Sequence, residues 1–84
     1  MFLHVTDVSY IEAYRLRVEF NDGVVKEVDL LGELHGEVFE PLKDVKFFQQ
    51  VRVNGETNTI EWPNGADFAP EFLYETGQEV KHVA

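Results

Sequence analysis

The sequence predicts an α+β fold: a small, hairpin-rich antiparallel sheet of about five strands, packed with two or three short helices. Three observations predict it. Residues 14–20 alternate apolar and charged side chains, which is the period of a half-buried strand. Asn-Asp-Gly and Gly-Glu-Thr-Asn each separate two strand-like runs, as hairpin turns do. Further along the chain, an aspartate before an apolar run and a proline before another are typical of helix starts.

The first strand is expected near the N-terminus, because residues 2–10 (FLHVTDVSY) are rich in β-branched and aromatic side chains. A short connection leads to the second strand, YRLRVEF, whose apolar residues lie on one face and whose charges lie on the other. Arg15 and Arg17 share the polar face of this strand. Glu27 and Asp29 on the next strand are placed to pair with them.

An Asn-Asp-Gly sequence joins the second strand to the third. We expect Asn21 and Asp22 to form a type I turn, with Gly23 at positive φ as a bulge. This turn folds residues 24–30 back antiparallel. The resulting register pairs Phe20 with Val24 and Leu16 with Val28.

The middle of the chain predicts irregular structure and one short helix. The run LLGELHGEVFEPL interrupts its leucines with two glycines and a proline, so we expect a single turn of helix followed by a loop. Asp44 is the expected N-cap of a short helix over DVKFFQQV, with Phe47 or Phe48 and Val51 on one side. Two short strands, VRVN and TIEW, then flank a second hairpin turn.

The block EWPNGADFAPEFLYE, residues 61–75, has the residue density of an active site or of a structural corner, and we interpret it as a corner. The tryptophan ends a strand in the core, Pro-Asn-Gly turns the chain, and the aspartate caps the next helix. Proline opens that helix and Gly77 closes it in a left-handed conformation. We expect residues 78–84 to fray. The corner comprises Trp62, Pro63, Asn64, Gly65, Asp67, Pro70, Leu73 and Tyr74.

Length and composition restrict the function. Eighty-four residues make one domain, residues 1–84, because so short a chain cannot divide its buried surface between two cores. Seven Lys and Arg against 16 Asp and Glu give a net charge of −9, which argues against direct nucleic-acid binding. The same charge either suits a basic protein partner or simply keeps the protein soluble, which needs no special function. The absence of cysteine excludes disulfides, thiolate zinc sites and thiol catalysis. No long apolar run predicts a membrane segment, so we expect a cytoplasmic protein.

No group of residues predicts a reaction. The three histidines, at positions 4, 35 and 82, lie in separate elements without metal-ligand spacing. The single serine lacks a glycine-rich elbow, and no glycine run precedes a lysine as in a phosphate-binding loop. Asp67 and Glu71 are explained by the helix start that they flank. We therefore expect no catalytic residue, no metal, no cofactor and no enzymatic activity.

The order of motifs resembles a known family. FNDG before VDL, then GEVFEPLKD and FFQQV, and finally IEWPNGADFAPEFLYE are similar to the domain-of-unknown-function family 2442 (DUF2442), found in small bacterial proteins. The resemblance implies an antiparallel sheet packed by short helices. It also implies free-standing chains or fusions to a helix-turn-helix domain, often encoded beside another small protein in a toxin–antitoxin-like arrangement. No catalytic residue is known for the family, so none is carried over.

Three hypotheses follow. The first is a non-enzymatic interaction module, an antitoxin-like partner of a basic protein encoded nearby, with Glu71 and Glu75 as the partner surface. The second is a small-molecule-binding or catalytic domain that uses a pocket between sheet and helices, near Trp62, Asp67 and Tyr74, although so small a domain has little room for the roughly 300 Å³ that ligand pockets need. The third is a regulatory domain acting with a transcription factor and forming homo-oligomers through an exposed strand edge.

Overall fold

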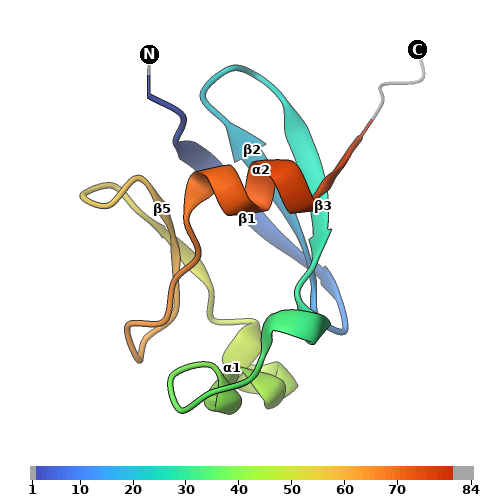
Figure 1. Ribbon diagram of the computed structural model, residues 1–84, viewed down its shortest axis with the longest axis vertical. Helices are drawn as coiled ribbons and strands as arrows, with labels where there is room; N and C mark the ends of the chain where they lie inside the picture. Colours follow the sequence, from blue (N-terminus) through green and yellow to red (C-terminus); the bar gives the residue numbers. More distant parts are fainter. Residues whose placement is uncertain (1, 81–84) are drawn as a thin grey trace.

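The computed structural model describes residues 2–80, which form the α+β fold that the sequence predicts. Figure 1 shows the arrangement of its strands, α-helices and 3-10 helices (η). In chain order these are β1 (Val5–Glu12), β2 (Arg15–Phe20), β3 (Val25–Asp29), η1 (Leu31–Glu33), η2 (Glu40–Lys43), α1 (Val45–Phe48), β4 (Arg52–Asn54), β5 (Thr59–Glu61), α2 (Pro70–Thr76) and β6 (Gln78–Glu79).

The strands form two antiparallel sheets. The larger sheet has the order β1-β2-β3-β6, and β4 pairs with β5 in a separate hairpin. Figure 1 shows α2 crossing in front of the larger sheet, with the β4–β5 hairpin at the side where β1 begins. The two sheets therefore enclose one core, which α2 covers.

The first strand begins and ends later than the sequence suggested. Phe2 is 93% exposed, and β1 starts only at Val5. Two register irregularities let β1 continue through the expected connection as far as Glu12, which pairs with Arg15. The chain then reverses over two residues, with Ala13 at a φ of 47°.

The β2–β3 hairpin confirms the predicted turn and register. Gly23 has a φ of 88°, and its N–H donates to the carbonyl of Phe20 at 2.9 Å. The N–H of Phe20 donates to the carbonyl of Val24, also at 2.9 Å. The Asp22 carboxylate accepts a hydrogen bond from the Val24 amide, and the pairing of Leu16 with Val28 continues the ladder.

The middle segment has more structure than one helical turn, because it forms both η1 and η2. Asp44 is the N-cap of α1, and its carboxylate accepts from the Lys46 amide at 3.0 Å. The helix is nevertheless a single turn that ends before Val51. The Gln50 amide bonds to the Phe47 carbonyl, and the Gln50 side chain approaches the Lys46 carbonyl, so the α-helical bonding pattern stops there.

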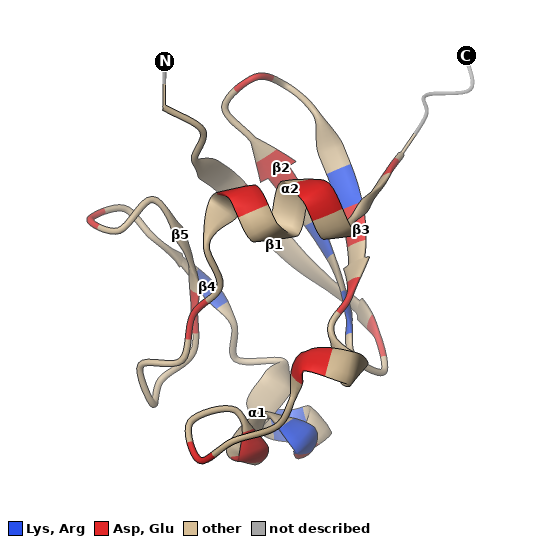
Figure 2. Cartoon of the chain, in the orientation of Figure 1, with Lys and Arg blue, Asp and Glu red and all other residues tan. Residues whose placement is uncertain are grey.

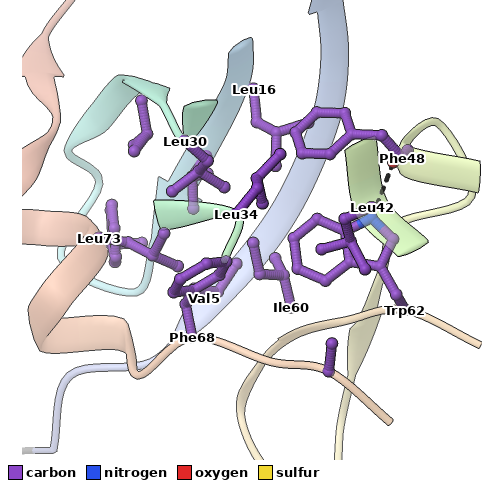
Figure 3. Close-up of a cluster of buried hydrophobic side chains, with 14 residues drawn as sticks. Val5, Leu16, Leu30, Leu34, Leu42, Phe48, Ile60, Trp62, Phe68 and Leu73 are labelled. Atoms are coloured by element: carbon purple, nitrogen blue, oxygen red, sulfur yellow. Dashed lines mark hydrogen bonds between the residues drawn. The ribbon is translucent and has the colours of Figure 1, made fainter. Parts of the chain in front are cut away.

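The core fills the space between the sheet, α2 and the β4–β5 hairpin. Leu16, Val18 and Phe20 on one face of β2 are buried, as the alternation predicts. Figure 3 shows the cluster extending from Trp62 and Phe48 at one end to Leu73 at the other. The remaining buried hydrophobic residues are Val5, Val28, Leu30, Leu34, Leu42, Ile60, Ala66 and Phe68.

The opposite face of the larger sheet is polar. The guanidinium groups of Arg15 and Arg17 lie 2.9 and 3.1 Å from the two carboxylate oxygens of Glu27, and Arg15 also pairs with Glu12. Asp29 differs from the expectation: its carboxylate accepts from the Leu31 amide instead of forming a cross-strand ion pair. Exposed pairs of this kind contribute little to stability.

The chain after α2 does not fray at residue 78. Gln78 and Glu79 form β6 and pair with Glu27 and Lys26 of β3, and the Val80 amide donates to the Val25 carbonyl. The polar composition concealed a strand, because an edge strand with both side chains in solvent has no apolar pattern. The rest of the expected tail, residues 81–84, lies outside the described residues.

Candidate functional site

The block of residues 61–75 forms a corner whose first part is a tight turn. The Gly65 amide donates to the Trp62 carbonyl and the Trp62 amide donates to the Ala66 carbonyl, both at 2.9 Å. Gly65 has a φ of 87°, and the Asn64 side chain accepts from the Ala66 amide. These bonds repeat those of the β2–β3 turn. Pro63 occupies the first turn position, where its missing N–H costs nothing.

Trp62 belongs to the core and offers no ligand surface. Its side chain is 1% exposed, and its indole N–H donates to the Phe48 carbonyl at 2.8 Å (Figure 3). The rings of Phe48 and Phe68 pack against it, with centroids 5.5 and 5.9 Å away. The indole thereby bonds one carbonyl at the end of α1, where carbonyls lack helical partners.

Asp67 does not cap α2, and that expectation was wrong. The N-cap is Ala69, which has no side-chain acceptor, and no side chain caps the helix. Asp67 lies two residues earlier, where its backbone bridges to Glu61 and its side chain is exposed. Because Pro70 is the first helical residue, a capping side chain would have to come from position 69.

Helix α2 follows the prediction at its start and departs from it at its end. Pro70 opens the helix and Leu73 is fully buried. Phe68 stacks on Phe72, with ring centroids 5.5 Å apart, which fixes the angle at which the chain enters the helix. Gly77 is extended, with φ −73° and ψ 160°, instead of left-handed, because the chain passes directly into β6.

Tyr74 joins α2 to the β2–β3 turn. Its hydroxyl donates to the Asp22 carboxylate at 2.8 Å. Its ring packs edge-on against Phe20 with centroids 5.0 Å apart, and the Lys26 ammonium lies 4.7 Å from the ring centroid. The partners lie 52 residues apart in sequence, so no local pattern could have predicted the contact.

This contact changes the titration of both groups. Hydrogen bonds from the Val24 amide and then from the Tyr74 hydroxyl lower the pKa of Asp22 below its ordinary 3.8. The hydrogen bond to Asp22 raises the pKa of Tyr74 above its ordinary 10.0. The Asp22 contribution to folding is therefore present above its unfolded pKa and is lost as pH falls through the lowered value. The Tyr74 contribution is present below its unfolded pKa and is lost as pH rises through the raised value.

The outer side of α2 is acidic. Glu71 and Glu75 are exposed, and among residues 2–80 neither has a basic side chain within ion-pairing distance. Figure 2 shows red and tan but no blue on α2, whereas blue segments occur on the sheets and near α1. The helix also lacks a basic residue in its last turn, where the helix dipole would favour one.

A hollow of about 450 Å³ lies away from the corner. The expectation that the domain has little room for such a space was therefore wrong, although this hollow is open and polar. It lies beside the end of β6, next to the part of β3 that β6 does not pair with. Trp62, Asp67 and Tyr74 do not line it. Its lining residues are Arg15, Glu27, Asp29, Thr76, Gln78, Glu79 and Val80.

The histidines are not brought together in the part of the chain that the structure describes. His4 is half-buried and its amide bonds to the Asn21 side chain, whereas His35 is exposed after η1. His82 lies outside the described residues. Within residues 2–80, no group of three potential metal ligands occurs. No helix in this range has the length and apolar character needed to cross a membrane.

Fold and site together define a small α+β domain with a structural corner and an acidic outer helix. Residues 5–79 match the family model described as protein of unknown function (DUF2442). Because this match covers nearly the whole chain, the protein belongs to that family. The comparison with curated proteins and the comparison with solved structures both found no match.

Proposed function

We propose that this protein is a non-enzymatic interaction module that binds a basic protein through the outer side of α2, as an antitoxin-like member of a two-protein system. The observation that carries the proposal is the placement of Glu71 and Glu75. They are exposed, acidic and four residues apart on a helix of seven residues.

The two positions differ in their effect on the helix: Glu71 lies in the first turn, where the dipole favours an anion, whereas Glu75 lies at the opposite end. Like charges at i and i+4 repel by roughly 0.2 to 0.5 kcal/mol, and Glu75 lies in the last turn, where the dipole disfavours an anion. Lys or Gln there would stabilise the helix instead. Glu75 therefore costs helix stability, and neither glutamate has a partner within residues 2–80, which favours a role in binding a basic group from outside.

The small-molecule alternative has less support. It depended on a pocket lined by Trp62, Asp67 and Tyr74. The tryptophan is buried, and the tyrosine hydroxyl already donates to Asp22. These contacts favour a structural role for the corner and leave the outer side of α2 as the surface for binding.

The test is co-purification with the protein encoded by the neighbouring gene, followed by calorimetric titration. We expect association at micromolar concentration or tighter, weakening as ionic strength rises because exposed charges are screened. The double variant Glu71→Gln, Glu75→Gln should weaken binding several-fold, since it removes both charges and preserves side-chain size.

A matched control separates a local effect from net charge. Glu37→Gln with Glu56→Gln also removes two exposed acidic residues without touching α2, so it changes the total charge equally. Binding should weaken several-fold in the α2 variant and stay unchanged in the control. Equal losses of affinity in the two variants would show that net charge alone, and not the outer side of α2, determines binding. A neighbouring protein that does not associate with this one at all would refute the proposal.

A further inference from the structure

Three places in the chain have an aspartate or asparagine followed by glycine: residues 22–23, 54–55 and 64–65. Such a pair is chemically reactive, because glycine has no Cβ to shield its amide nitrogen from the side-chain carbonyl of the residue before it. When that nitrogen attacks the side-chain Cγ, a cyclic succinimide forms. The fold determines at which of the three pairs this attack can occur.

In the pair Asn64-Gly65, both of the groups that would react are held by hydrogen bonds. The Asn64 Oδ1 accepts from the Ala66 amide at 3.1 Å, and its Nδ2 donates to the Val38 carbonyl at 2.9 Å. The Gly65 amide donates to the Trp62 carbonyl at 2.9 Å. Attack on the Asn64 Cγ therefore requires all of these bonds to break.

The pair Asp22-Gly23 is held in the same way. The Asp22 carboxylate accepts from the Val24 amide at 2.9 Å and from the Tyr74 hydroxyl at 2.8 Å. The Gly23 amide donates to the Phe20 carbonyl at 2.9 Å. An ionised carboxylate is also a poor electrophile, so this pair is protected by its charge as well as by its hydrogen bonds.

The pair Asn54-Gly55 lies where β4 ends and the turn of the β4–β5 hairpin begins, and it is held less firmly. The Asn54 Oδ1 accepts from the Glu56 amide at 2.8 Å, which is the one hydrogen bond of this side chain within residues 2–80. The Gly55 amide has no acceptor in the same part of the chain. Gly55 and Glu56 are both exposed, and an exposed turn is where a chain moves most easily.

We propose that Asn54 is a site of spontaneous deamidation, and that the fold protects Asn64 and Asp22 from the same attack. The Gly55 amide nitrogen loses its proton and forms a bond to the Asn54 Cγ. The Cγ–Nδ2 bond then breaks and ammonia leaves. Water opens the succinimide at either of its carbonyls, which leaves aspartate or isoaspartate at position 54. Either product makes the net charge one unit more negative than −9.

The two products affect the hairpin differently. Aspartate keeps the backbone and still offers an oxygen to the Glu56 amide, whereas isoaspartate adds one carbon to the main chain of the turn. The Asn54 carbonyl accepts from the Asn58 amide at 2.8 Å, and the Asn58 carbonyl accepts from the Val5 amide at 2.9 Å. Isoaspartate would therefore displace the contact that holds the start of β1. The reaction does not involve α2, so its test is independent of the proposed function.

The test is incubation of the protein at mildly alkaline pH, both folded and unfolded in guanidinium chloride, followed by peptide mass spectrometry that locates each new carboxylate. In guanidinium chloride the two Asn-Gly pairs should convert at similar rates, because the fold no longer distinguishes them. In the folded protein, residue 54 should convert at least roughly tenfold faster than residue 64, because fewer hydrogen bonds restrain its reacting groups.

Two variants identify the attacking group and the product. A Cβ at Gly55 meets nothing within 4 Å, and Gly55 is outside the left-handed region, so Gly55→Ala should fold normally. Its methyl group shields the amide nitrogen and should slow conversion of Asn54 several-fold. Asn54→Asp reproduces the aspartate product. Hydrogen exchange of the Val5 amide should be faster in the incubated protein than in this variant, because only the incubated protein contains isoaspartate.

Three results would overturn the inference. Conversion of residue 64 at least as fast as residue 54 in the folded protein would show that the hydrogen bonds around Asn64 do not protect it. Conversion of both in guanidinium chloride, but of neither in the folded protein, would show that the hairpin also protects Asn54. Equal rates in Gly55→Ala and wild type would exclude the Gly55 amide as the attacking group.

Discussion

Replacing Gly77 by alanine tests the packing between α2 and the sheet. A Cβ atom at this position would lie 2.8 Å from the Lys26 Cβ, 2.8 Å from the Val28 Cγ2 and 2.9 Å from the Leu73 carbonyl oxygen. The backbone φ of −73° suits any residue, so glycine is required here only because there is no room for a Cβ atom. Lys26 and Val28 are held by the pairing of β3 with β2 and cannot move without shifting the strand.

The expected cost follows from two opposing terms. Overpacking a tight site costs about 1 to 3 kcal/mol, whereas the reduced freedom of the unfolded chain on Gly→Ala returns about 0.4 to 1 kcal/mol. The midpoints of these two ranges give a net expected loss of about 1.3 kcal/mol. For a domain of this size, each kcal/mol lowers Tm by roughly 4 to 8 °C, so the variant should melt roughly 5 to 10 °C lower.

Urea and thermal unfolding measure this loss, and Gly32→Ala provides the control. A Cβ at Gly32 meets nothing within 4 Å, so this substitution should change stability by less than about 1 kcal/mol. Hydrogen exchange of the β6 amides should also be faster in Gly77→Ala, because displacement of α2 from the sheet would weaken the pairing of β6 with β3. A Gly77→Ala protein that melts at or above wild type would refute the close approach.

Three further substitutions test the corner and its contacts. Trp62→Phe removes the indole N–H and leaves a carbonyl of α1 without its partner. Urea unfolding should show a free energy of unfolding lower by about 2 to 4 kcal/mol, because both the hydrogen bond and core volume are lost. A change below about 1 kcal/mol would contradict the hydrogen bond. Asp44→Ala removes an N-cap and should lower the free energy of unfolding by about 0.5 to 2 kcal/mol, whereas Asp67→Ala should change it by less than about 0.5 kcal/mol. A larger loss for Asp67→Ala than for Asp44→Ala would show that Asp67 caps α2. Tyr74→Phe should raise the pKa of Asp22 toward its ordinary value in a titration followed by NMR, and should be less stable than wild type at neutral pH, with the difference shrinking in acid and in strong alkali; an unchanged pKa would show that the hydroxyl does not reach the carboxylate.

The sequence predicts those parts of the fold that a few adjacent residues determine. The β2–β3 turn and the turn after Trp62 share one geometry, because an Asp or Asn side chain bonds the amide two residues later and the intervening glycine takes a positive φ. These requirements are local, so Asn-Asp-Gly and Pro-Asn-Gly specify both turns. The alternation in β2 is equally local and predicts its buried face.

The errors occur where a residue beside a helix meets a strand. Gly77 follows a helix and has the position of a left-handed cap, but the nearness of β3 decides its conformation. Asp67 precedes a helix and has the chemistry of a cap, but its bridge to Glu61 turns it away. In both cases the residue type is compatible with two roles, and contact with a strand selects one: β3 for Gly77 and the end of β5 for Asp67.

The same distinction applies to the candidate site. The exposure of Glu71 and Glu75 follows from the helix that Pro70 begins, so the sequence identifies them. The position of β1 at the end of the larger sheet does not follow, because strand order depends on which strands pair across the whole chain. β6 joins the larger sheet beside β3, and β1 therefore becomes its other edge strand.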